Sequence, residues 1–179
     1  MILHESRLIF VHIIKTGGTS IETVFKQPPS DHRTVKDYIS ILGEDLYKQY
    51  FSFTIVRNPW DKMVSQYHFN AKKWVPECTT FREYIRLFGG GRQISRYSPL
   101  HFPYLTNEHG EINVDYVGKF ENLQESFNHI CKESGLNIMS LPHEKKSGRI
   151  HYRDYYDEES KNIVGNMFEE EIDYFKYKY

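Results

Sequence analysis

The residues best suited to chemistry lie near the start of the chain, in the segment Lys15-Thr16-Gly17-Gly18-Thr19-Ser20. Glycines let the main chain approach a ligand closely, and N–H groups at the start of a helix bind anions. The ammonium of Lys15 adds positive charge, and the three hydroxyl groups of the segment add hydrogen-bond donors. The segment therefore predicts a site for a phosphate-like anion, with a plain glycine turn as the alternative.

A second group of donors follows the apolar run Phe51–Val56. Arg57 comes directly after this run, and Ser65 lies about two turns into the helix that the next residues predict. A guanidinium binds phosphate through two parallel hydrogen bonds, which makes Arg57 a candidate for holding a second anion. The alternative is an ion pair between Arg57 and a carboxylate such as that of Asp61.

The elements around these donors are predicted from hydrophobic patterning. The apolar run 8–14 is typical of a buried parallel strand, and Thr19 or Ser20 is expected to cap the helix after it. The run 51–56 predicts a second such strand, followed by a helix with Asn58 as its cap and Pro59 in its first position. Each donor group is thus expected at a point where a strand ends and the next helix begins.

The rest of the chain extends this pattern. Apolar spacing predicts helices over 35–46 and 123–131, with Gly135 closing the second, and a third strand over 115–120. Residues 72–114 are read as a loop-rich insertion on one side of the sheet, with a short helix around 81–88. Asp157 is expected to cap a last helix with an apolar stripe. We predict one α/β domain over 1–179, in which a central parallel sheet is flanked by helices.

Composition limits the function classes. The 179 residues carry a formal net charge of −1, so no nucleic-acid partner is expected, and any anion site must be local. With two cysteines in a chain too large to need disulfide staples, neither a disulfide framework nor a thiolate-rich zinc site is expected, and no run of residues is apolar enough to predict a membrane span. We expect a soluble protein of a reducing compartment, the cytoplasm, with no metal.

The order of residues in the glycine segment argues against two common nucleotide-binding classes. A Walker A loop places its lysine after the glycines, whereas Lys15 precedes them. The G-x-G-x-x-G pattern of dinucleotide-binding proteins is also missing. An ATPase, a GTPase or a dinucleotide-dependent enzyme is therefore not expected.

Three ordered motifs carry a family resemblance. They are Phe10-Val11-His12-Ile13-Ile14-Lys15-Thr16-Gly17-Gly18-Thr19-Ser20, then Val56-Arg57-Asn58-Pro59-Trp60-Asp61 running to Ser65, and Val117-Gly118-Lys119-Phe120-Glu121-Asn122-Leu123. With these motifs the chain resembles the sulfotransferase superfamily, most closely the branch of carbohydrate sulfotransferases such as the heparan sulfate 2-O and 6-O enzymes. Ile14 departs from the pattern, because proline is frequent there in the family.

The resemblance implies a P-loop-like, three-layer fold that binds 3′-phosphoadenosine 5′-phosphosulfate (PAPS) and moves its sulfuryl group to a hydroxyl or amine. The segment Lys15–Ser20 would hold the 5′-phosphosulfate, and Arg57 and Ser65 would hold the 3′-phosphate. Two donor groups at neighbouring strand ends suit the two anionic ends of one cofactor. A basic stretch also resembles the third cofactor segment of the family, at Lys146, Ser147 and Arg149; a solvated basic loop is the alternative.

Sulfuryl transfer needs a base for the acceptor proton and positive charge on the leaving oxygen. Lys15 suits the second task. The resemblance implies a histidine base between the glycine segment and the Arg-Asn-Pro strand, and His32 is the histidine in that interval. His101 is the second candidate and Glu22 the third, with a surface residue as its alternative, while His12 is read as a packed residue.

The acceptor is predicted from weaker signals. Aromatic side chains and the basic bias of the insertion suit a small-molecule or saccharide acceptor that carries negative charge. Two rival functions stay open: a magnesium-dependent kinase of nucleotides or small molecules, and a nucleotide-binding protein of the same fold without catalysis.

Overall fold

The computed structural model describes residues 1–29, 31–142 and 149–179, without the side chains of 71–74. The described residues form two compact units, each with a hydrophobic core of its own. Unit 1 holds the described residues of 1–56 and 101–142, and unit 2 those of 57–100 and 149–179. The glycine segment therefore belongs to unit 1, and Arg57 begins unit 2.

Unit 1 is built on a sheet whose described strands follow the order β1-β2-β3-β4. These are β1 (Ile2–Leu3), β2 (Leu8–Val11), β3 (Phe51–Val56) and β4 (Tyr116–Lys119). β2 pairs in parallel with β3, and β3 with β4, so that Phe10 lies opposite Phe53. β2 is wholly buried, as a continuous apolar run predicts. β1 pairs antiparallel with β2, and this two-residue edge strand was not predicted.

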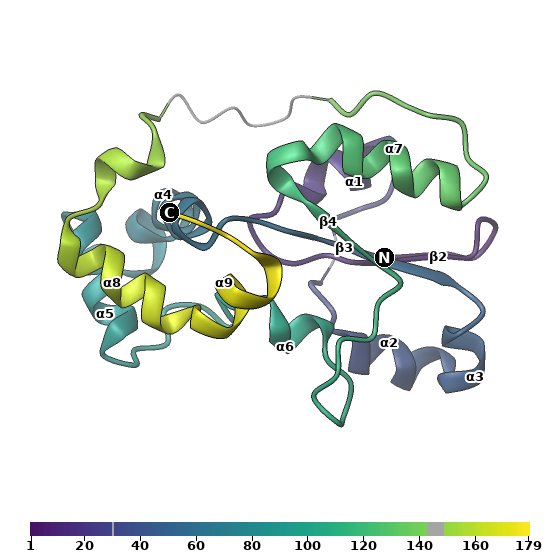
Figure 1. Ribbon diagram of the computed structural model, residues 1–179, viewed down its shortest axis with the longest axis horizontal. Helices are drawn as coiled ribbons and strands as arrows, with labels where there is room; N and C mark the ends of the chain where they lie inside the picture. Colours follow the sequence, from purple (N-terminus) through teal and green to yellow (C-terminus); the bar gives the residue numbers. More distant parts are fainter. Residues whose placement is uncertain (30, 143–148) are drawn as a thin grey trace. The chain divides into compact units, whose positions relative to one another are not determined.

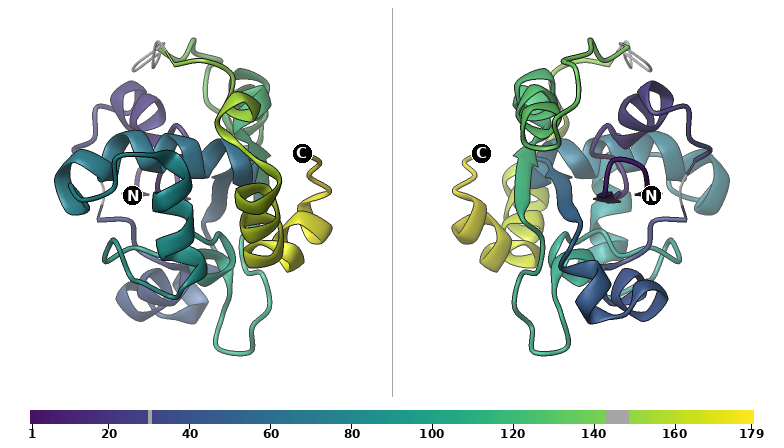
Figure 2. Two further views of the ribbon diagram at one scale, coloured as in Figure 1. Left: turned by 90° about the vertical axis from the view of Figure 1, so that its left-hand side faces the viewer. Right: turned by 90° about the vertical axis from the view of Figure 1, so that its right-hand side faces the viewer.

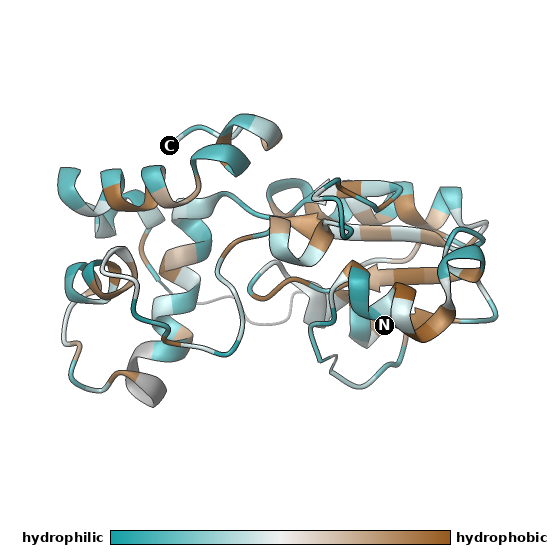
Figure 3. Cartoon of the chain, turned by 90° about the horizontal axis from the view of Figure 1, so that it is seen from below, coloured by the Kyte–Doolittle hydropathy of each residue, from teal (hydrophilic) through white to brown (hydrophobic). Residues whose placement is uncertain are grey.

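Helices cover both faces of this sheet. α1 (Gly18–Val24) and α7 (Leu123–Glu133) lie on one face, and α2 (Val35–Leu42) and α3 (Glu44–Tyr47) lie on the other (Figures 1 and 2). The first face is sealed by apolar side chains from β2, β3, α1 and α7, and the strands accordingly colour as hydrophobic in Figure 3. The described part of this unit also contains α6 (Phe102–Leu105) and the short η1 (Phe120–Asn122). The predicted α/β fold with a mainly parallel central sheet is confirmed.

Two helix boundaries in unit 1 differ from the prediction. α1 begins at Gly18 rather than at a Thr19 or Ser20 cap, because Gly17 adopts left-handed backbone (φ 85°) and serves as the N-cap without a side-chain bond. The predicted helix over 35–46 is two helices, because Gly43 turns the chain with φ 79°. Glycine conformations that leave no trace in hydrophobic spacing set both boundaries.

Unit 2 is helical in its described part. It contains α4 (Pro59–Trp74), α5 (Phe81–Gly89), η2 (Tyr152–Tyr155), α8 (Glu158–Met167) and α9 (Glu169–Phe175). Its core joins aromatic residues of α4 and α5, among them Trp60 and Tyr84, to Val164 of α8. The Asn58 side chain accepts from the N–H of Trp60 at 3.1 Å, and Asp157 caps α8, which confirms both predicted caps. The predicted last helix is interrupted at Phe168. Of the described helices, none is long and apolar enough to cross a bilayer.

A buried lysine links α4 to the rest of unit 2. Lys62 is 0% exposed, and its Nζ donates to the Pro99 carbonyl at 2.6 Å. Burial lowers the pKa of Lys62 to about 7; the buried carboxylate of Glu171 opposes this decrease, and Arg57 adds to it. The proton on Lys62 therefore binds more weakly in the folded protein than in the unfolded chain.

This difference makes stability depend on pH. Between about pH 7 and pH 10 the unfolded chain holds a proton on Lys62 that the folded chain releases, so the free energy of unfolding rises with pH. Urea titrations at several pH values should show this rise in the wild type and a smaller one in Lys62→Met. Lys178→Met, which removes an exposed lysine of the same unit, is the control and should keep the wild-type slope. Equal slopes in all three proteins would refute the role of Lys62.

Candidate functional site

The glycine segment is held in place by packing on two sides. Gly17 has a φ of 85°, and a Cβ at this position would come within 3.0 Å of the side chains of Phe120 and Leu123. Those two residues belong to the third sequence motif, Val117–Leu123. The first and third motifs are thus in contact, and a side chain at position 17 would separate them.

Gly18 packs on the ring of His12, which follows β2. A Cβ on Gly18 would lie 2.2 Å from both Cδ2 and Nε2 of this ring, closer than any real contact. His12 is 6% exposed, and its ring stacks on Phe10 with 5.2 Å between centroids. The start of α1 can therefore approach the end of β2 only with glycine at position 18.

The His12 ring is also fixed by a carboxylate. Its Nδ1 lies 2.7 Å from Oε1 of Glu22, on α1, and Glu22 is 2% exposed. Because an ionised carboxylate only accepts hydrogen bonds, Nδ1 of His12 is the donor. Glu22 is therefore a buried partner of His12 and not a surface residue.

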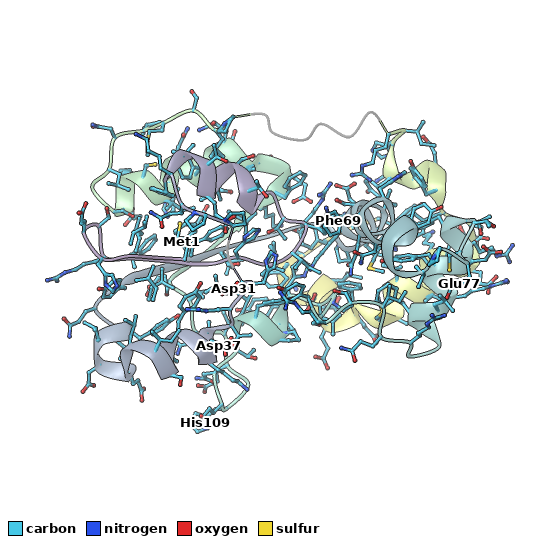
Figure 4. The ribbon with its side chains drawn as sticks, turned by 180° about the vertical axis from the view of Figure 1, so that it is seen from behind. Met1, Asp31, Asp37, Phe69, Glu77 and His109 are labelled. Atoms are coloured by element: carbon cyan, nitrogen blue, oxygen red, sulfur yellow. The ribbon has the colours of Figure 1, made fainter. Side chains whose placement is uncertain are left out.

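His32 lies against His12. Its Nδ1 is 2.9 Å from the main-chain carbonyl of His12, and the two rings meet at an angle of 62° with 4.5 Å between centroids. A carbonyl only accepts, so Nδ1 of His32 carries the hydrogen and Nε2 is left as the basic nitrogen of the neutral ring. Figure 4 labels the neighbouring residues Asp31 and Asp37, the second of which forms the capping box of α2 with Thr34.

Lys15 and His32 share an uncommon backbone conformation. Their φ angles are 63° and 53°, in the left-handed region that favours glycine. Such residues cost of order 1 kcal/mol and persist when surrounding contacts hold them, often at functional sites. The two residues expected to act on the reacting group are thus both held in strained backbone.

The hydroxyl groups of the segment do not all point the same way. Thr16 is 0% exposed, and its hydroxyl donates to the Ile13 carbonyl at 2.9 Å, so this side chain braces the turn. Thr19 is half-buried, and Ser20 is 7% exposed within the first turn of α1. The predicted contribution of Thr16 then reduces to its main-chain N–H.

In unit 2, Asp61 joins two of the predicted cofactor residues. Nε of Arg57 donates to Oδ2 of Asp61 at 2.8 Å, and Arg149 donates to the other carboxylate oxygen. Arg57 is 7% exposed, and the Asp61 side chain is largely buried. The ion pair considered as an alternative for Arg57 is therefore present, but it also brings a second guanidinium to the same carboxylate.

The other predicted site residues are placed separately. Ser65 is half-buried on α4, one turn beyond Asp61. His101 is fully buried at the start of α6, in unit 1. Lys146 and Ser147 lie outside the described residues. Within the described part of the chain, no group of three or more His, Cys, Asp or Glu side chains could hold a metal ion.

Sequence reasoning missed two interactions. The Glu22–His12 pair joins a strand end to a helix, and neither residue has a local pattern that signals the other. The Arg149–Asp61 contact spans 88 residues. The Arg57–Asp61 spacing, one helical turn, was the signal available for the second site.

Comparisons with known proteins bear on the family and the fold of the chain. A family model described as "Sulfotransferase family" matches residues 1–178. An uncharacterized protein of Archaeoglobus fulgidus is 32% identical over 97 residues, which make up 53% of this chain and 76% of that protein. The crystal structure of mouse sulfotransferase SULT7A1 complexed with PAP is similar with a TM-score of 0.58 and 14% identity, covering 96% of this chain and 86% of that one. At this identity the structural likeness concerns the fold.

The packing of Gly18 on His12 gives a stability prediction. Gly18→Ala should lower the free energy of unfolding by about 1–3 kcal/mol, because the added methyl group meets a ring that cannot move away. Gly165→Ala is the matched control: its methyl group meets only Trp60 at 3.7 Å, within α8, and should be neutral or stabilising. Urea unfolding measures both. Adding His12→Ala should recover part of the loss, and additive effects of the two substitutions would contradict direct contact.

The position of Asp61 between two arginines gives a second prediction. Asp61→Asn should lower the free energy of unfolding by about 2 kcal/mol, because two largely buried guanidinium groups lose their shared negative partner. Asp173→Asn, on the exposed side of α9, should have little effect. Stability of Asp61→Asn equal to that of the wild type in urea would show that the carboxylate does not hold the two arginines.

Proposed function

Since a match over residues 1–178 shows that this chain belongs to the sulfotransferase family, we propose that it transfers a sulfuryl group from PAPS to a hydroxyl or amine group of an acceptor, in particular a saccharide. The observation that carries the proposal is the 2.9 Å contact from Nδ1 of His32 to the His12 carbonyl. This contact brings the predicted base to the strand end that leads into the segment Lys15–Ser20. A base and an anion-binding segment are the two parts that the reaction needs closest together.

The residues of the segment fit the 5′-phosphosulfate. Glycine at positions 17 and 18 removes side chains from the turn, and Lys15 supplies positive charge. SULT7A1, the structural neighbour, was crystallised with PAP, which supports the same cofactor class here. Arg57, Ser65 and Arg149 are proposed to hold the 3′-phosphate, with Asp61 orienting the two guanidinium groups. We also propose Lys146 and Ser147 for this group.

The chemistry assigns a different task to each residue. When bound, PAPS supplies a sulfuryl group attached to a phosphate leaving group. The acceptor oxygen forms a bond to sulfur, the bond from sulfur to the phosphate oxygen breaks, and Nε2 of His32 takes the acceptor proton. Lys15 stabilises the negative charge that grows on the leaving oxygen. His101 is the second candidate for the base. The buried Glu22 already binds His12, so it is a weaker candidate.

The proposal predicts separable effects on binding and turnover. His32→Ala should lower kcat by about 10²–10⁴-fold and leave the Kd for adenosine 3′,5′-bisphosphate unchanged, because the base acts on the acceptor. Lys15→Ala should lower kcat and also weaken binding of the bisphosphate. Arg57→Ala should mainly weaken this binding, by about 2–4 kcal/mol. Calorimetry measures binding, and transfer of labelled sulfate to a panel of hydroxyl and amine acceptors, including acidic saccharides, measures turnover.

His109→Ala is the matched control for the histidine substitution. His109 lies exposed in the turn 107–110, labelled in Figure 4, and its loss should leave both quantities unchanged. Full activity of His32→Ala would transfer the role of the base to His101. Binding of the bisphosphate without transfer to any acceptor would favour a non-catalytic nucleotide-binding protein. Transfer of phosphate from ATP that stops on addition of a chelator would favour the kinase.

A further inference from the structure

We propose that His12 and Glu22 form a positioning pair, which holds His32 in the tautomer that can accept a proton; this inference rests on the proposed function for its catalytic part. The pair lies wholly within unit 1, at the junction of β2, α1 and the segment before α2. Neither residue needs to touch the cofactor or the acceptor. Their proposed role is exerted through His32.

The His12 ring is held in one position by three contacts. Phe10 stacks on its face at 5.2 Å, Glu22 binds its Nδ1 at 2.7 Å, and Gly18 closes its Cδ2–Nε2 edge. The stack continues to Phe53 on the neighbouring strand, with 4.8 Å between the rings of Phe10 and Phe53. The ring is thus fixed by the sheet on one side and by α1 on the other.

The fixed ring of His12 packs against the ring of His32. The two imidazoles meet at 62° with centroids 4.5 Å apart, and the main chain of His12 accepts the Nδ1 hydrogen of His32 at 2.9 Å. His12 therefore contacts His32 through both its side chain and its carbonyl. A base must offer an unprotonated nitrogen, and fixing the hydrogen on Nδ1 makes Nε2 that nitrogen.

The negative charge of Glu22 determines which nitrogen of His12 carries the hydrogen. A buried carboxylate is costly unless it is bound, and the Nδ1–H of His12 provides that contact inside the unit. Replacing the carboxylate by an amide lets the side chain donate as well as accept, so that Nδ1 of His12 is no longer forced to carry the hydrogen. The His12 ring then loses the charged partner of its Nδ1, which is one of the three contacts that orient it against His32.

The backbone of His32 explains why such support is needed. Its φ of 53° is unfavourable for a residue with a side chain, so this conformation requires contacts that hold it. The carbonyl and the ring of His12 are two such contacts. A positioning pair at this place stabilises both the strained main chain and the reactive tautomer.

The test compares Glu22→Gln and His12→Asn with the wild type. Glu22→Gln keeps the size of the side chain, and His12→Asn keeps a donor near Nδ1, so both should fold, which thermal unfolding will verify. Long-range ¹H–¹⁵N spectra of the imidazoles report the tautomer without cofactor or acceptor. The wild type should show His32 with hydrogen on Nδ1, and Glu22→Gln should show a mixture with the Nε2 form. His12→Ala should shift the His32 signals further than His12→Asn.

Turnover provides the second readout. Glu22→Gln should lower kcat about tenfold or more with an unchanged Kd for adenosine 3′,5′-bisphosphate, and His12→Asn should retain more activity than His12→Ala. Glu125→Gln, an exposed glutamate on α7, is the matched control and should change neither spectra nor kcat. Unchanged His32 signals and kcat in Glu22→Gln and His12→Ala would overturn the proposal. If the wild type transfers no sulfate but the tautomer responds, the proposed function fails and the positioning pair stands.

Discussion

The structure of unit 1 depends on one close approach, between the first residue of α1 and a buried imidazole. Because Gly18 has no side chain, α1 can begin against the ring of His12. The glycine segment therefore packs closely on the residue that follows β2. Glu22 can reach His12 because α1 starts there and not two residues later. The ring of His12 also packs against the ring of His32. The order of residues in the first motif thus reflects a packing requirement.

In each unit a largely buried carboxylate orients nitrogen donors of other side chains. Glu22 determines which nitrogen of His12 carries a hydrogen, and Asp61 gathers Arg57 and Arg149. In both places a largely buried carboxylate fixes the orientation of the donors that it binds. In this way a chain without excess positive charge holds clusters of hydrogen-bond donors in a fixed orientation.

Local sequence signals predicted the parts of the fold that depend on local physics. Apolar runs identified β2 and β3, and Asn58 and Asp157 were recognised as caps from their neighbours. The prediction was wrong where a glycine took a left-handed conformation, as at Gly17. It also missed the two-residue strand β1, which is too short to show a period. For the site, residue types indicated the candidate donors and the Arg57–Asp61 pair, whereas the Glu22–His12 pair and the Arg149–Asp61 contact were found only from the structure.

The left-handed backbone of Lys15 and His32 has a consequence for protein engineering. Glycine adopts this conformation without the steric cost that other residues bear, of order 1 kcal/mol or more. A screen for heat resistance would therefore tend to enrich glycine at both positions and discard the ammonium and the imidazole. Under the proposed function, thermal stability and reactivity therefore place opposite demands on these two positions, so a library intended to retain activity should hold both codons constant.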